Sequence, residues 1–87
     1  MYHIFYTKTA IKDIPKLKSA HLDKTAKSLI DVIKENPVQV PPPFQKLFGD
    51  LQGAYSRRIN IKHRLIYEVL EEQKIIKILS LWTHYER

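Results

Sequence analysis

The sequence predicts an α+β fold with the element order β-α-α-β-β-β, in which two N-terminal helices pack on one face of an antiparallel sheet. Two patterns predict it. Apolar residues recur with a helical period between residues 10 and 33, and three runs of strand-forming residues with short links fill residues 54–82. The 87 residues are expected to form one domain, 1–87, because a chain of this length builds a single modest core.

The chain begins with YHIFY at residues 2–6, whose aromatic and β-branched side chains predict a short strand. Thr7 or Thr9 can cap a first helix over about residues 8–18. Pro15 lies inside that segment. It is expected to kink or shorten the helix, because proline lacks an N–H donor and clashes with the preceding turn.

The second helix has the clearest amphipathic pattern. Ser19 is expected to cap it, and Asn36 followed by Pro37 is expected to end it. The apolar positions that predict its buried face follow at helical spacing: Leu22, Ala26, Leu29, Ile30 and Ile33.

Residues 37–53 connect the helices to the sheet, and the three prolines at 41–43 favour an extended path. Four apolar side chains are expected to pin this loop to the core: Phe44, Leu47, Phe48 and Leu51. Strands are predicted within residues 54–61, 63–70 and 74–82, with a hairpin turn at 71–73. Such short links predict an antiparallel meander.

The composition favours a polyanionic partner. The net charge is +6 and the pI is about 9.7, so nucleic acid comes first, an acidic protein second and an anionic membrane third. The absence of cysteine excludes disulfides and thiolate metal sites and fits a cytoplasmic protein. No apolar run approaches a membrane span, and the N-terminus is interpreted as part of the fold rather than as a signal peptide. The four histidines fit no zinc spacing, so neither a metal nor a cofactor is expected.

Cations and aromatic rings alternate in GAYSRRINIKHRLIY at residues 53–67, and WTHY at residues 82–85 adds a histidine and two rings. This combination suits a phosphate backbone with stacked bases. Strand alternation predicts that Arg64, one of Arg57 and Arg58, and His84 share an exposed face. RNA cleavage through the ribose 2′-hydroxyl needs a base, a cation for the phosphoryl oxygens and an acid, and these residue types suit those roles.

A structural alternative exists for the same residues. The arginines could instead be salt-bridged to acidic side chains of the sheet and its loops, namely Asp50, Glu68 and Glu71. Tyr67 and Trp82 could belong to the core rather than stack on RNA.

The run DLQGAYSRRINIKHRLIY at residues 50–67, followed by WTHY, resembles the Txe/YoeB toxins of bacterial toxin–antitoxin modules, within the RelE-like superfamily. The blocks G-x-[YW]-S-R-R-I, H-R-L-[IV]-Y and H-Y occur in the family's order over about the last half of the chain. The resemblance implies a RelE-like, microbial-RNase-like fold and a ribosome-dependent endoribonuclease that cuts translated mRNA in the A site. It also implies a cognate YefM/Phd-type antitoxin with an acidic inhibitory segment, the 70S ribosome with its mRNA as target, and a homodimer.

The resemblance also implies roles for individual residues. Arg64 matches the phosphate-stabilising arginine, His84 the catalytic histidine and Tyr85 the adjacent tyrosine. Arg57 and Arg58 match the S-R-R pair, whose second member usually lies near the active site. Two further residues are expected to contact RNA, Lys46 and Tyr55.

One position departs from the family. Counting back without gaps from Ser56, the place of the family's general-base glutamate is taken by Gln45. A glutamine cannot accept the 2′-hydroxyl proton, and general base catalysis typically contributes about 10²–10⁴-fold. Three explanations are open: an attenuated toxin, a deliberate Glu→Gln substitution, or another base such as His84 or Asp50.

Three functional hypotheses follow. The first is an mRNA interferase with impaired activity or a variant base. The second is a toxin-fold protein that binds ribosome, RNA and antitoxin without cleavage. The third is a basic DNA-binding module, which ranks last because the basic cluster lies on predicted strands rather than on a recognition helix.

Overall fold

The computed structural model describes residues 1–49 and 53–84, and the side chain of His84 is outside the described part. Within these ranges the elements follow in the order β1 (His3–Tyr6), α1 (Lys8–Ser19), α2 (Asp23–Glu35), β2 (Gln45–Lys46), β3 (Ala54–Arg58), β4 (His63–Leu70) and β5 (Ile75–His84).

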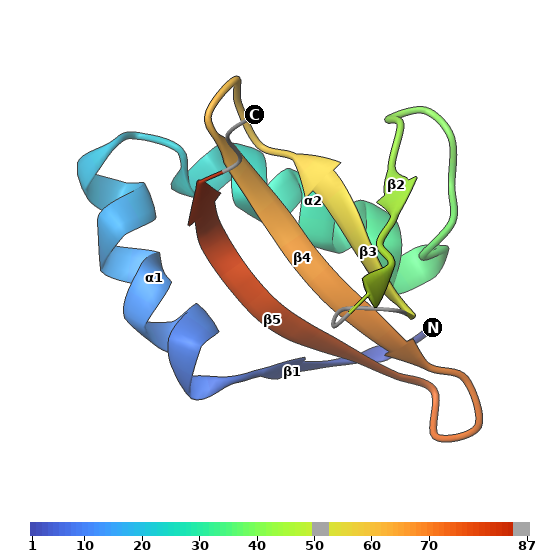
Figure 1. Ribbon diagram of the computed structural model, residues 1–87. Helices are drawn as coiled ribbons and strands as arrows, with labels where there is room; N and C mark the ends of the chain where they lie inside the picture. Colours follow the sequence, from blue (N-terminus) through green and yellow to red (C-terminus); the bar gives the residue numbers. More distant parts are fainter. Residues whose placement is uncertain (50–52, 85–87) are drawn as a thin grey trace.

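The strands form one sheet in the order β1-β5-β4-β3-β2, seen edge to edge in Figure 1. Neighbours from β2 to β5 pair antiparallel, which confirms the predicted meander and the α+β class. Two details differ from the prediction. First, β1 runs parallel to β5, an arrangement that needs a long connection, here the rest of the chain. Second, the loop contributes the two-residue strand β2, which is too short to show a sequence period.

The first helix begins as predicted and continues through its proline. Thr7 is the N-cap and its hydroxyl oxygen accepts from the Ala10 N–H at 3.2 Å. The expectation that Pro15 shortens the helix is wrong, because α1 continues to Ser19. Pro15 is exposed, so water can bind the carbonyl of Ile11 that proline leaves without a donor.

The second helix starts later than predicted. Ser19 does not cap it, because Ser19 is the last residue of α1. The N-cap is instead Leu22, which offers no side-chain acceptor, and the acidic Asp23 occupies the first turn. The predicted end is confirmed, since Asn36 is the C-cap.

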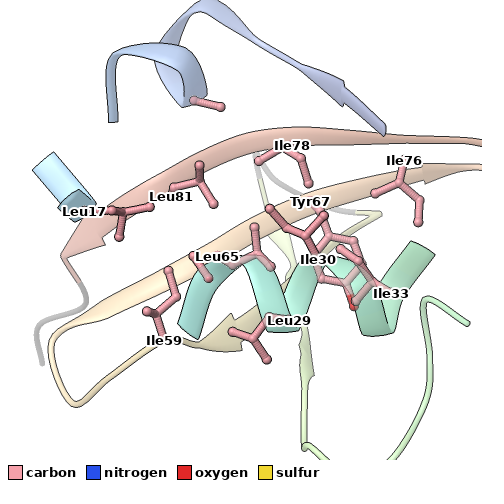
Figure 2. Close-up of a cluster of buried hydrophobic side chains, with 12 residues drawn as sticks. Leu17, Leu29, Ile30, Ile33, Ile59, Leu65, Tyr67, Ile76, Ile78 and Leu81 are labelled. Atoms are coloured by element: carbon pink, nitrogen blue, oxygen red, sulfur yellow. The ribbon is translucent and has the colours of Figure 1, made fainter. Parts of the chain in front are cut away.

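Both helices contribute to one hydrophobic cluster against the sheet. Figure 2 shows Ile30 and Ile33 of α2 beside Tyr67 of β4, and Leu29 and Leu65 belong to the same cluster. Leu17 of α1 lies at the other end of this cluster, near Leu81 of β5, and Ile76 and Ile78 complete the β5 side. The alternate residues of β4, Arg64 and Ile66, therefore lie on the face of the sheet that the helices leave open.

The connecting loop is held less by apolar packing than expected. Phe44 and Leu47 are half-buried, but Phe48 is 78 % exposed, so the expectation that it pins the loop is wrong. Leu51 lies outside the described residues. The loop is instead held by a buried arginine, Arg57, whose contacts are described below.

Candidate active site

Three neighbouring strands bring Gln45, Ser56 and Arg64 together on the open face of the sheet. In the ladder Gln45 of β2 is paired with Ser56 of β3, and Ser56 with Ile66 of β4. Arg64, two residues before Ile66, points to the same side. Its Nε donates to Ser56 Oγ at 2.6 Å, and its Nη2 donates to Gln45 Oε1 at 2.8 Å. Residues distant in sequence thus meet on this face.

The orientation of the Arg64 guanidinium is fixed by its neighbours. Its side chain is 8 % exposed, whereas Gln45 beside it is exposed. Two of its nitrogens are used by Ser56 and Gln45, which fix the plane of the fork. A planar, permanently charged fork held at the edge of an open face is suited to binding two oxygens of one phosphate.

Arg58 joins this face. Its Cα is paired with that of Arg64, and its side chain is exposed. The prediction that one of the two adjacent arginines shares the face of Arg64 is therefore met by Arg58, so a second cation stands beside the first.

Arg57 has a different role, which corrects the expectation that it contacts RNA. It is completely buried and paired with Leu65 on the helix side of the sheet. Its Nε donates to Tyr67 Oη at 3.0 Å. The other nitrogens donate to three carbonyls of the connecting loop: Pro42 at 2.6 Å, Gln39 at 2.9 Å and Pro37 at 3.1 Å. Arg57 thus fixes the loop that leads into Gln45.

Tyr67 also contacts this loop. Its hydroxyl donates to Pro37 O at 2.7 Å while accepting from Arg57. Arg57, Tyr67 and the loop carbonyls that they bind are called the Arg57 clamp below. Burial raises the pKa of the Tyr67 phenol above its usual value, although the nearby Arg57 acts in the opposite direction. The phenol is thereby kept in its neutral, donating form. The alternative that Tyr67 belongs to the core is confirmed.

Lys46 and Tyr55 are paired with each other on the side of the sheet opposite to Gln45. The Tyr55 ring stacks on Tyr67 with centroids 5.4 Å apart and meets Phe44 edge-on at 5.5 Å. The structure does not bring these two expected RNA contacts beside Arg64. Lys46 is exposed and Tyr55 is half-buried.

The end of β5 breaks the simple alternation that the sequence suggested. Its register against β4 shifts twice, between Arg64 and Ile66 and between Ile66 and Tyr67. Extra residues in β5 change which side chains share a face. Ser80 and Thr83 accordingly contact each other through their hydroxyls, whereas unbroken alternation would separate them. Trp82 stacks on His63, with ring centroids 3.8 Å apart and an angle of 16°.

The predicted catalytic histidine is the last residue of β5. Its Cα is paired with that of His63, while Arg64 is paired with Thr83. The side chain of His84, and all of Tyr85 and Asp50, lie outside the described residues.

Sequence reasoning missed two residues of this region. Ser56, which is 1 % exposed, orients Arg64, and its place within the S-R-R-I block was the available signal. Asp13 of α1, 5 % exposed, accepts hydrogen bonds from two amides near the end of β5. No local pattern indicated it, because the contact joins residues at opposite ends of the chain.

Other features of the described residues do not form a competing site. They contain no group of three or more histidine and acidic side chains placed to hold a metal ion. No helix among them has the length and apolar character needed to cross a membrane. A cavity of about 520 Å³ lies between α1, α2 and β1, with Ile4, Ile14 and Ile30 among its lining residues, and it does not include Arg64.

The chain is similar to known proteins in sequence and in fold. Residues 6–85 match the family model described as the YoeB-like toxin of bacterial type II toxin–antitoxin systems. Toxin YoeB of Synechocystis sp. is 36% identical over 59 residues, which span 68% of this chain and 66% of that protein, slightly less than two thirds of its length.

Two solved structures extend the similarity over nearly the whole chain. The YoeB/ParE toxin of Agrobacterium tumefaciens superposes with a TM-score of 0.86 at 25% identity, covering 95% of this chain and 99% of the other. YoeB of Staphylococcus aureus, in a YoeB–YefM complex, gives 0.81 at 32% identity, covering 98% and 99%. The same S. aureus toxin, as a dimer, also gives 0.81 at 32% identity, covering 97% and 98%.

Proposed function

This chain belongs to the YoeB-like toxins of bacterial type II toxin–antitoxin systems, and from that premise we propose that it is a ribosome-dependent endoribonuclease acting in the cytoplasm. Its substrate is mRNA under translation, cut in the ribosomal A site. The observation that supports the proposal is the contact of the Arg64 guanidinium with Ser56 and with Gln45, the residue that the resemblance aligns with the family's general base.

The reaction is an attack of the ribose 2′-oxygen on the adjacent phosphorus, with breakage of the bond to the 5′-oxygen. Arg64 stabilises the charge that accumulates on the phosphoryl oxygens, and Arg58 adds positive charge on the same face. His84, assisted by Tyr85, gives a proton to the leaving 5′-oxygen. The products are a 2′,3′-cyclic phosphate and a 5′-hydroxyl.

Removal of the proton from the 2′-hydroxyl is the slow step, because in this chain the proton passes to water rather than to a carboxylate. Gln45 accepts from Arg64 through Oε1, and its amide cannot take up a proton as a carboxylate would. A glutamate in the same place would meet the charged Nη2 directly, which lowers a carboxyl pKa and keeps it ionised near neutral pH. The native chain is therefore an attenuated enzyme, slower than its glutamate variant by up to about 10²–10⁴-fold.

The experiment compares the native protein, Gln45→Glu and Arg64→Ala in a toeprinting assay on translating ribosomes, with folding checked by circular dichroism. Cleavage should rise strongly in Gln45→Glu, and Arg64→Ala introduced into that variant should abolish it. If neither the native protein nor Gln45→Glu cuts mRNA, the endoribonuclease proposal is wrong.

A second candidate is a toxin-fold protein that binds ribosome and antitoxin without cleavage, and the same Gln45–Arg64 contact favours it. Here the uncharged glutamine preserves the orientation of the arginine while removing the base. Ribosome binding without cleavage by the native protein supports it. Slow cleavage by the native protein that disappears in His84→Ala argues against it.

The partners belong to the same proposal. S. aureus YoeB is found with YefM, and we propose a YefM/Phd-type antitoxin with an acidic segment that neutralises this +6 chain. Arg58→Ala and Arg64→Ala should each weaken antitoxin binding measured by calorimetry, and unchanged affinity would show that the segment binds elsewhere. A homodimer is proposed by the same likeness and is tested by sedimentation velocity.

A further inference from the structure

The end of β5 contains an irregularity that needs support. Between the pairs Ile66–Ser80 and Arg64–Thr83, two residues of β5, Leu81 and Trp82, lie opposite the single residue Leu65 of β4. A bulge of this kind disrupts the hydrogen-bond ladder locally and leaves backbone groups that need other partners. The bulge ends two residues before His84, which is the predicted catalytic histidine and the last residue of the strand.

The support comes from the first helix. Asp13 projects from α1 into this region and is 5 % exposed. Its Oδ2 accepts from the Leu81 N–H at 3.0 Å and from the Trp82 N–H at 3.2 Å. Its Oδ1 lies 3.6 Å from Nζ of Lys16, a half-exposed side chain one helical turn away. One buried carboxylate oxygen thus satisfies both amides of the bulge.

Three further contacts depend on how this bulge is held. The indole of Trp82 stacks on His63 at 3.8 Å. Thr83, the next residue, contacts Ser80 and is paired with Arg64. His84 follows and is paired with His63. His84 is therefore only two residues beyond Trp82, whose amide is held by Asp13.

We propose that Asp13 is a positioning residue that fixes the bulged end of β5 and thereby the backbone position of His84, whose Cα is paired with that of His63. The idea rests on the proposed endoribonuclease function for its catalytic consequence, but its structural part stands independently. In this proposal Asp13 acts through the backbone at Leu81 and Trp82 and not by contact with the substrate. Displacing a catalytic group by about 1 Å typically lowers the rate by about 10²-fold.

The structural part is tested without RNA. Trp82 is the only tryptophan in the chain, so its fluorescence reports on this strand end alone. In Asp13→Ala the emission should shift to longer wavelength as the indole leaves its stack on His63. Asp13→Asn should keep the native emission, because one amide oxygen can accept from both N–H groups. The matched control is Leu29→Ala, which weakens the core from α2 and should leave the emission of the folded protein unchanged.

The catalytic part uses the Gln45→Glu background. There Asp13→Ala should lower kcat by about 10²-fold with little change in KM, Asp13→Asn should restore most of the rate, and Leu29→Ala should act only through the folded fraction. If Asp13→Ala keeps both native emission and native kcat, the proposal is overturned. If no variant cleaves RNA while the emission still shifts, the function proposal fails and the positioning of β5 stands.

One measurement needs no variant. Hydrogen exchange on the native protein, followed by NMR, should show that the Leu81 and Trp82 amides are protected as strongly as the core of β5. Rapid exchange of both amides would contradict the proposal even if Asp13→Ala fails to fold.

Discussion

The Arg57 clamp predicts that a charge-conserving substitution, Arg57→Lys, is strongly destabilising. The guanidinium makes four hydrogen bonds, to Tyr67 Oη and to the carbonyls of Pro37, Gln39 and Pro42. These acceptors lie on different edges of the fork, and one ammonium group cannot reach all of them. Lysine also places a more strongly hydrated charge in a site where the native side chain is 0 % exposed.

The magnitude follows from these contacts. A hydrogen bond to a charged group contributes about 1.5–3 kcal/mol, so the loss of two amounts to about 3–6 kcal/mol. Two features reduce this loss of stability. Pro37 O keeps its bond from Tyr67, and the bonds to Gln39 and Pro42 are only part-buried, so water can replace the lost donors. The expected decrease in the free energy of unfolding is about 2–4 kcal/mol.

Urea unfolding followed by Trp82 fluorescence measures the effect, and Arg58→Lys is the matched control. Arg58 is the adjacent residue on the same strand, but it is exposed, so its replacement should change stability by less than about 0.5 kcal/mol. Equal midpoints for Arg57→Lys and Arg58→Lys would refute the reasoning, because they would show that the forked geometry contributes nothing.

Three further predictions concern stability. Tyr67→Phe should lower the unfolding free energy by about 1–2 kcal/mol at pH 7. Because burial raises the Tyr67 pKa, the stability that the phenol contributes is present below pH 10 and is lost as the pH rises further. The difference in unfolding free energy between the native protein and Tyr67→Phe, measured by urea titration, should therefore narrow above about pH 10. Thr7→Ala should cost about 1–2 kcal/mol through loss of the cap on Ala10, while Thr7→Ser should cost much less; equal losses would contradict the capping argument. Gln45→Glu should gain about 0.5–1 kcal/mol from pairing with Arg64. Since that pairing lowers the glutamate pKa, the gain should be present at pH 7 and vanish by about pH 3, and a gain that persists at pH 3 would speak against it.

The sequence predicted the fold where local patterns decide it. Among residues 1–49 and 53–84, the helical period and the strand runs identified every helix and every strand except the two-residue β2. Alternation within β4 correctly separated Arg64 and Ile66 from Leu65 and Tyr67, because an unbroken strand has a fixed period of two.

Prediction failed where tertiary contacts override the local signal. The two adjacent arginines of β3 look equivalent in sequence, yet one is fully buried and the other exposed, because the loop carbonyls converge on Arg57 alone. The bulges of β5 have no sequence signature here, so simple alternation does not predict that Ser80 and Thr83 lie on the same side of the strand. The proximity of Gln45 to Arg64 was available only through the family resemblance.

The pairing of β1 with β5 has a consequence for when this protein becomes complete. During synthesis β1 emerges well before its described ladder partner, Ile75–Ile78. The bulge amides that Asp13 binds are later still. Long-range closure of this kind is slow compared with local contacts. A nascent chain therefore cannot assemble the proposed site before β5 has been made, so the activity proposed against translating ribosomes would arise only after that strand has emerged.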